Sequence, residues 1–222
     1  MFRWGRASVT YACIAGAALI LGHSFGRGSL LTQANPWLPL QGLEAHTFSL
    51  VLGAAFAALV VLGTRVLVAN VGWAKNLHRD LRPLTFQLDG AGILVIACLS
   101  AVAEELVFRG LLLPWVGLVP QALLFGLVHA QLNGPSRWVW VTWASVVGLA
   151  LGAMFALTGS LLGSVLAHGL INALNLLYLK SHDPAPPRHA LGGLLSDRRS
   201  PVPPELPSTL HRPSPMPAGR RA

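Results

Sequence analysis

Charged residues are scarce in this sequence. They make up 11% of the 222 residues, whereas hydrophobic residues make up 53%, and the mean hydropathy is +0.57. Soluble globular domains carry about 25% charged residues. The composition therefore excludes an ordinary water-soluble globule, and we predict an integral membrane protein.

Cysteine is also rare, and several functional motifs are missing. Cys13 and Cys98 both lie in apolar runs without CxxC spacing, so they indicate neither a disulfide framework nor a metal site. The sequence contains no glycine-rich phosphate loop, no HExxH pattern and no GxSxG elbow. A nucleotide site, a zinc-protease helix and a serine-hydrolase elbow are thus not indicated.

Long apolar runs are what the sequence does contain. A helix needs about 20 apolar residues to cross the hydrocarbon of a bilayer. Residues 119–132 are short for this purpose, so that helix is tilted, partly re-entrant, or extended by the connection before it. We predict an all-α, polytopic helical membrane bundle of about six transmembrane helices, in the runs 8–26, 47–70, 90–113, 119–132, 138–157 and 160–179.

The first run could also be a secretory signal, because it is preceded by Arg3 and Arg6. Residues 22–25 read Gly-His-Ser-Phe, and five further apolar runs follow. We therefore favour a retained first helix.

Positive charges predict the orientation. They precede the first run, lie between the second and third runs at Lys75, Arg79 and Arg82, and follow the sixth run. With six crossings these regions fall on one side, so both termini are predicted to be cytoplasmic. The alanine- and arginine-rich composition favours a bacterial inner membrane. The net charge of +8 is explained by topology, and no nucleic-acid partner is predicted.

The chain divides into three regions by sequence character. Residues 1–89 hold the amino-terminal helices, and residues 90–180 hold the polar motifs. Ten of the sixteen prolines lie in residues 181–222, where apolar periodicity ends. Such a segment buries too little apolar surface to offset its ordering entropy, so we predict a disordered cytoplasmic tail.

Ionisable residues interrupt the third apolar run. Ionisable groups at bilayer depth cost several kcal/mol each and usually mark a functional interior. Glu105 and Arg109 are four residues apart on one helix face and can form an ion pair, whereas Glu104 is turned about 100° away. Glu104 is therefore the candidate general base for activating a water molecule. The alternative is that both glutamates only make polar contacts between helices.

Two further segments repeat the spacing of four. Phe125 and His129 share one helix face, and His168 and Asn172 share another. A single histidine on an apolar face is more often a hydrogen-bonded core residue than a catalyst, but an asparagine amide is a donor suited to an oxyanion. Three such segments on successive spans indicate a common site.

These residues carry a family resemblance. The order Glu-Glu-x-x-x-Arg, Phe-x-x-x-His and His-x-x-x-Asn over residues 90–179 resembles the CPBP family of intramembrane proteases, which includes CAAX proteases and Abi proteins. The resemblance implies a glutamate-type endopeptidase without a required cofactor. Glu104 and His129 would activate water, His168 and Asn172 would form the oxyanion hole, and Glu105 with Arg109 would orient the motif helix.

The resemblance also implies the partners. The substrate would be a membrane protein or a lipid-anchored peptide, cleaved for carboxy-terminal processing, sorting-signal removal or bacteriocin-related maturation. Three alternatives stay open. Glu104, His129 and His168 are acceptable zinc ligands, although zinc is not favoured. Intramembrane Glu, His and Arg also build transporters and proton relays, and a catalytically silent immunity or scaffold protein would carry similar helices.

Overall fold

The computed structural model describes residues 4–131, 134 and 136–184. The described residues form helices and connecting coil, with one isolated bridge between Thr32 and Ser160. This confirms the all-α prediction. The helices are α1 (Gly5–Ser24), α2 (Gly42–Asn70), α3 (Gly72–Leu81), η1 (Arg82–Thr85), α4 (Gly90–Glu105), η2 (Leu106–Leu112), α5 (Leu113–Val116), α6 (Leu118–Val128), α7 (Ser136–Thr158) and α8 (Leu161–Ser181).

Within the described residues, five helical segments are long and apolar enough to cross a membrane. They are α1, α2, the continuous segment Gly90–Val116, α7 and α8. The protein is accordingly an integral membrane protein. The compact unit ends at Pro184, so all but four residues of the predicted tail 181–222 lie outside the described residues.

The predicted helix in residues 119–132 is present but too short to span a bilayer. Helix α6 has 11 residues, and at 1.5 Å per residue it covers about 16 Å of a hydrocarbon core about 30 Å thick. It begins after Gly117, whose φ of 86° reverses the chain after α5. It ends at Val128, because His129 has left helical geometry at φ −86° and ψ 2°.

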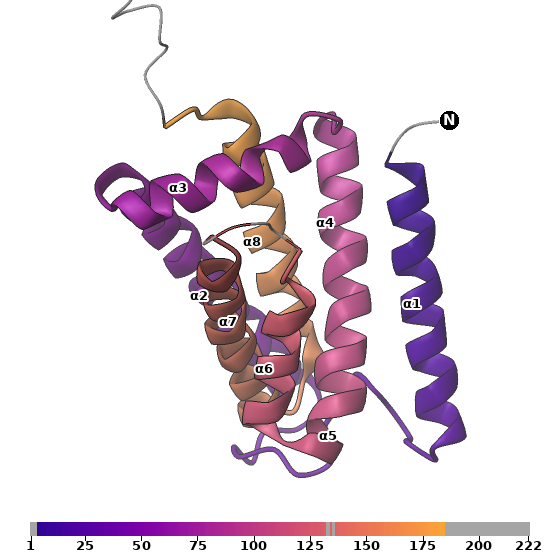
Figure 1. Ribbon diagram of the computed structural model, residues 1–222. Helices are drawn as coiled ribbons and strands as arrows, with labels where there is room; N and C mark the ends of the chain where they lie inside the picture. Colours follow the sequence, from indigo (N-terminus) through magenta and orange to yellow (C-terminus); the bar gives the residue numbers. More distant parts are fainter. Residues whose placement is uncertain (1–3, 132–133, 135, 185–222) are drawn as a thin grey trace, which may run out of the picture. The chain divides into compact units, whose positions relative to one another are not determined.

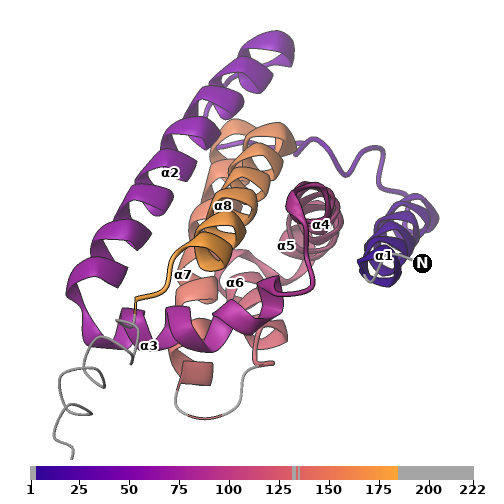
Figure 2. The ribbon, with the colours of Figure 1, turned by 90° about the horizontal axis from the view of Figure 1, so that it is seen from above.

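The helices pack into a bundle that α3 crosses at one end (Figures 1 and 2). Helix α4 lies beside α1, and α8 lies beside α2. Helix α6 turns back along α7. As a result, the two ends of the described unit, at residues 4 and 184, lie on the α3 side of the bundle (Figure 1).

The segment that carries the paired glutamates is not a uniform α-helix. The α-helix α4 ends at Glu105 and continues as the seven-residue π-helix η2, which contains Arg109. Turns of π-helix are rare inside helices and are frequent at functional sites. The sequence predicted only a regular helix over residues 90–113, because its apolar composition does not distinguish the two helix types.

Glycines allow α2 and α8 to approach closely. A Cβ atom built at Gly53 would overlap the carbonyl oxygen of Gly163, and one at Gly163 would overlap Ser49. The Ser49 hydroxyl uses this proximity: it accepts the Gly163 N–H at 3.0 Å and donates to the Ser160 carbonyl at 2.9 Å. Small residues that let backbones approach are typical of helix contacts in membranes.

We expect Gly53→Ala to destabilise the fold. The added methyl group has no room between α2 and α8, and overpacking of this kind costs about 1–3 kcal/mol. Gly63→Ala is the matched control on the same helix, because its Cβ meets no atom within 4 Å. Thermal unfolding in detergent would measure both, and equal stability of the two variants would contradict the close α2–α8 contact.

Candidate active site

A buried ion pair forms the base of the site. Arg109 Nη1 donates to Glu105 Oε1 at 2.7 Å, and both side chains have 0% exposure. The second guanidinium nitrogen, Nη2, donates to the Gly148 carbonyl at 2.9 Å. The guanidinium also lies 4.4 Å from the centroid of the Phe125 ring. Arg109 thereby ties η2 to α6 and α7, and the predicted pairing of Glu105 with Arg109 is present.

Glu105 also holds the histidine of α8. His168 Nδ1 lies 2.8 Å from Glu105 Oε1, the same oxygen that accepts from Arg109. Because Glu105 is paired with a cation, its carboxylate is an acceptor and Nδ1 carries the hydrogen. The opposite ring nitrogen, Nε2, then faces Glu104 at 3.9 Å.

The end of α6 positions the second histidine. His129 Nδ1 lies 2.7 Å from the Phe125 carbonyl oxygen, which can only accept. In a regular α-helix the backbone N–H of His129 would donate to the Phe125 carbonyl. Here the helix ends, and this N–H donates to the Gly126 carbonyl. In the neutral ring, His129 Nε2 is then without a hydrogen, and it faces Glu104 Oε2 at 3.8 Å. The early end of α6 thus sets both the place and the tautomer of His129.

Glu104 is the convergence point of the two rings. Its Oε2 atom is buried and has no hydrogen-bond partner among the described residues. The separations of 3.8 and 3.9 Å from the two Nε2 atoms are too long for direct hydrogen bonds and suit a bridging water molecule. Unlike Glu105, the Glu104 side chain keeps 16% exposure.

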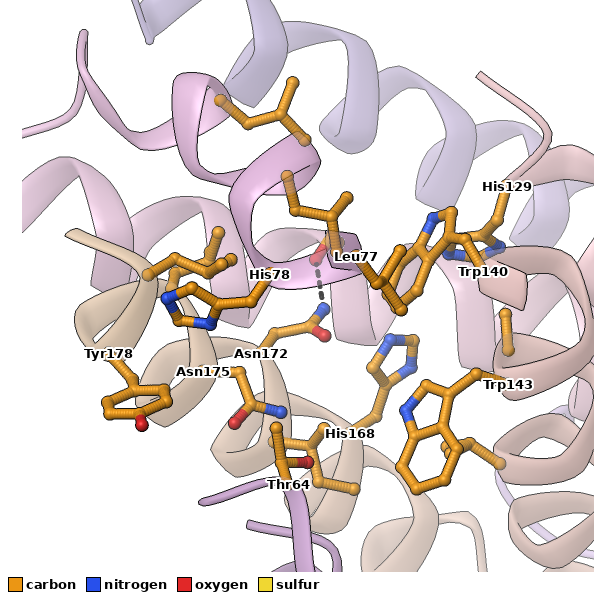
Figure 3. Close-up of a pocket in the computed structure, with 18 of the residues that line it drawn as sticks. Thr64, Leu77, His78, His129, Trp140, Trp143, His168, Asn172, Asn175 and Tyr178 are labelled. Atoms are coloured by element: carbon orange, nitrogen blue, oxygen red, sulfur yellow. Dashed lines mark hydrogen bonds between the residues drawn. The ribbon is translucent and has the colours of Figure 1, made fainter. Parts of the chain in front are cut away.

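Asn172 lines the same cavity one helical turn after His168. Its Nδ2 donates to the Ser100 hydroxyl at 3.1 Å, the dashed line in Figure 3, and its oxygen lies on the side of His168. The Ser100 hydroxyl in turn donates to the Ala97 carbonyl at 3.3 Å. The structure therefore brings together all six predicted residues, and it adds Ser100 as the residue that holds the Asn172 amide.

The site opens into a cavity of about 370 Å³ between the bundle and α3. Its walls are mainly apolar and aromatic, and Figure 3 shows Leu77, Trp140 and Trp143 around it. His78 of α3 also faces the cavity, where its Nε2–H donates to the His182 carbonyl at 3.0 Å. Burial lowers the pKa of His78, so this imidazole is neutral near pH 7.

Two polar residues of the site were not found from the sequence. The Tyr11 side chain of α1 lies near Glu104 and lines the cavity. Ser100 precedes Glu104 by four residues, so the helical spacing could have indicated it. Tyr11 belongs to an apolar run far away in the chain, and no spacing connects it with the motifs.

Possible metal ligands lie among the described residues. Among them, no group of three or more His, Cys, Asp and Glu side chains is arranged to hold a metal ion. The candidate ligands Glu104, His129 and His168 do lie near one another, as described above. Chelation of the purified protein therefore distinguishes the zinc alternative from the glutamate mechanism.

The geometry defines a carboxylate–histidine site inside a bundle of membrane helices. Comparison with known proteins identifies the family: residues 87–174 match the Rce1-like type II CAAX prenyl endopeptidases, so this segment is a domain of that family. The match includes every predicted site residue, from Glu104 to Asn172. It confirms the resemblance that the three motifs carry.

One curated relative is the uncharacterized protein YpbD of Bacillus subtilis (strain 168). It is 33% identical over 82 residues, which represent 37% of this chain and 42% of that protein. The aligned segment thus spans less than half of either protein. No solved structure gave a significant match.

We expect Arg109→Met to destabilise the fold strongly. The substitution leaves the Glu105 carboxylate without its cation, and breaking a buried pair from one side costs about 3–5 kcal/mol. Glu104→Gln is the matched comparison and should destabilise the fold less, because Glu104 makes no direct hydrogen bond to a cation and its side chain keeps 16% exposure. Thermal unfolding of both variants in detergent tests the difference, which would disappear if the pair were energetically unimportant.

Proposed function

We propose that this protein is an intramembrane glutamate-type endopeptidase, which hydrolyses a peptide bond of a protein substrate at the membrane. One observation carries the proposal. His129 Nε2 and His168 Nε2 lie 3.8 and 3.9 Å from Glu104 Oε2, while one oxygen of Glu105 accepts from both Arg109 and His168. One carboxylate is thus left to act on water, and the other is structural.

In the first step, a water molecule held by Glu104 and His129 attacks the scissile carbonyl carbon. In the neutral form of His129, Nε2 accepts from this water, because Nδ1–H is directed to the Phe125 carbonyl. Glu104 takes the proton of the water as the new C–O bond forms. No Ser or Cys nucleophile is required, so no covalent acyl-enzyme forms.

His168 and Asn172 then stabilise the oxyanion of the tetrahedral intermediate. Since His168 Nδ1–H already donates to Glu105, donation from Nε2 requires the imidazolium form. In that form the charges of the site cancel, because the carboxylates of Glu104 and Glu105 then face two cations, His168 and Arg109. Asn172 supplies an N–H by an amide rotation that exchanges Nδ2 and Oδ1, since the Ser100 hydroxyl can donate as well as accept.

In the second step, the C–N bond breaks. The proton that Glu104 took from water passes to the leaving nitrogen, so the products are a carboxylic acid and an amine, and Glu104 returns to its starting form. Removal of one oxyanion donor typically costs about 10²–10³ in rate.

The proposed substrate is a membrane protein or a lipid-anchored peptide. Its cleavage would serve carboxy-terminal processing, sorting-signal removal or bacteriocin-related maturation. We further propose a bacterial inner membrane with the α3 end on the cytoplasmic side. Lys75, Arg79 and Arg82 of the α3 region lie at the same end as the two ends of the described unit, which supports this orientation.

We expect Glu104→Gln to abolish cleavage while the protein still inserts into the membrane. The amide cannot take a proton from water, so the rate should fall by at least about 10²-fold. Glu44→Gln is the matched control, because Glu44 is an exposed residue of α2. The measurement is comparative peptidomics of membrane and secreted fractions, in which a terminal segment should persist only in the Glu104→Gln cells. Identical peptidomes would refute the proposal and favour transport or a scaffold role.

Chelation tests the zinc alternative. The purified enzyme, stripped of metal ions, should cleave the substrate found by peptidomics at its full rate, because Glu104 and His129 activate the water without an ion. Loss of activity on chelation, with recovery on adding Zn²⁺, would replace the glutamate mechanism by a metal-dependent one.

A further inference from the structure

The polar face of α8 continues beyond the proposed oxyanion donors. His168, Asn172 and Asn175 are spaced by four and three residues, so they lie on one face of the helix. All three line the cavity (Figure 3). Asn175 is the first residue after the matched segment 87–174, and neither the sequence motifs nor the proposed mechanism includes it.

Arg65 of α2 fixes the Asn175 amide. Its Nη1 donates to Asn175 Oδ1 at 2.9 Å, and its Nη2 donates to the Leu174 carbonyl at 2.8 Å. The guanidinium carbon also lies 3.7 Å from the centroid of the Tyr178 ring, a favourable cation–π position. Two hydrogen bonds and one ring contact therefore hold the guanidinium, which in turn determines where Asn175 Oδ1 lies.

Because Oδ1 is occupied, the amide nitrogen of Asn175 is directed elsewhere. Figure 3 shows it turned toward the side of His168 and Trp143, and the oxygen turned toward Tyr178. Asn175 Nδ2 meets no hydrogen-bond acceptor within the described part of the chain. Two N–H donors thus face a cavity whose walls are mainly apolar. A ligand that displaces water from this cavity must offer an acceptor there.

The spacing along α8 matches an extended peptide. The midpoint between His168 and Asn172 lies five residues before Asn175, or about 7.5 Å along the helix axis. Two residues of an extended chain cover about 6.6 Å. In an extended chain, carbonyls two residues apart point to the same side, so the scissile carbonyl and one other carbonyl can face α8 together.

We propose that Asn175 is a substrate-binding residue that donates to a main-chain carbonyl two residues from the scissile carbonyl, and that Arg65 is its positioning residue. This inference rests on the proposed peptidase function and adds a second point at which the enzyme binds the backbone of an extended peptide. It makes binding depend on the substrate backbone at that point and not on a side chain. It also gives α2, which lies outside the family match, a part in substrate binding.

The test uses a synthetic peptide that spans the cleavage site found by peptidomics. We expect Asn175→Ala to raise KM by about 5–10-fold, the usual effect of one hydrogen bond, with kcat within about twofold. Arg65→Met should raise KM similarly, and the double variant should be no worse than either single one, because Arg65 acts through Asn175. Asn70→Ala is the control, since Asn70 is an exposed residue of α2 bonded only to its own helix.

A second peptide separates binding from a merely structural tie between α2 and α8. In it, an alkene replaces the peptide unit that contributes the proposed carbonyl. The wild-type enzyme should bind this peptide less tightly than the parent peptide. Asn175→Ala should bind the two peptides equally, because it already lacks the donor. If both enzymes lost affinity equally, the carbonyl would not meet Asn175 and the inference would be wrong. If wild-type enzyme cleaved neither peptide, the proposed peptidase function would be wrong, and so would the substrate-binding role of Asn175.

Discussion

The site depends on one buried carboxylate, that of Glu105. A single oxygen of this residue accepts from Arg109 and from His168, so it joins η2 to α8. Arg109 extends the link to α7 through the Gly148 carbonyl. Removing one partner of a buried ion pair leaves an uncompensated charge, which is strongly destabilising. The helices that carry the site are therefore held together by the same group that orients the His168 ring.

The short helix α6 is the second constraint. A full-length span in its place would carry residue 129 onward inside a regular helix, where its ring could not close onto the Phe125 carbonyl in the same way. Because α6 ends at Val128, His129 caps the helix and turns Nε2 to Glu104. Because α6 is too short to cross the membrane, its end lies inside the bundle and places the His129 ring near Glu104.

The sequence predicted the class of fold and much of the site, for identifiable reasons. Apolar runs reveal membrane helices directly, and the spacing of Glu105 and Arg109 predicts their contact because both belong to one helix. The convergence of Glu104, His129 and His168 is different: spacing alone does not bring separate helices together, and the family resemblance supplied that expectation. The π-helix η2 and the residues Tyr11 and Arg65 were not predicted, because their significance arises only from tertiary packing.

Phe125 contacts both the buried Arg109 guanidinium and the His129 ring. Its ring covers the Arg109 guanidinium at 4.4 Å, and its centroid lies 4.7 Å from that of His129 on the cavity side. Mobile ions weaken interactions between groups that solvent reaches, and they act far less on buried pairs. Changes in ionic strength should consequently affect Glu104 and the charges that approach it more than the buried pair of Glu105 and Arg109, which is screened much less.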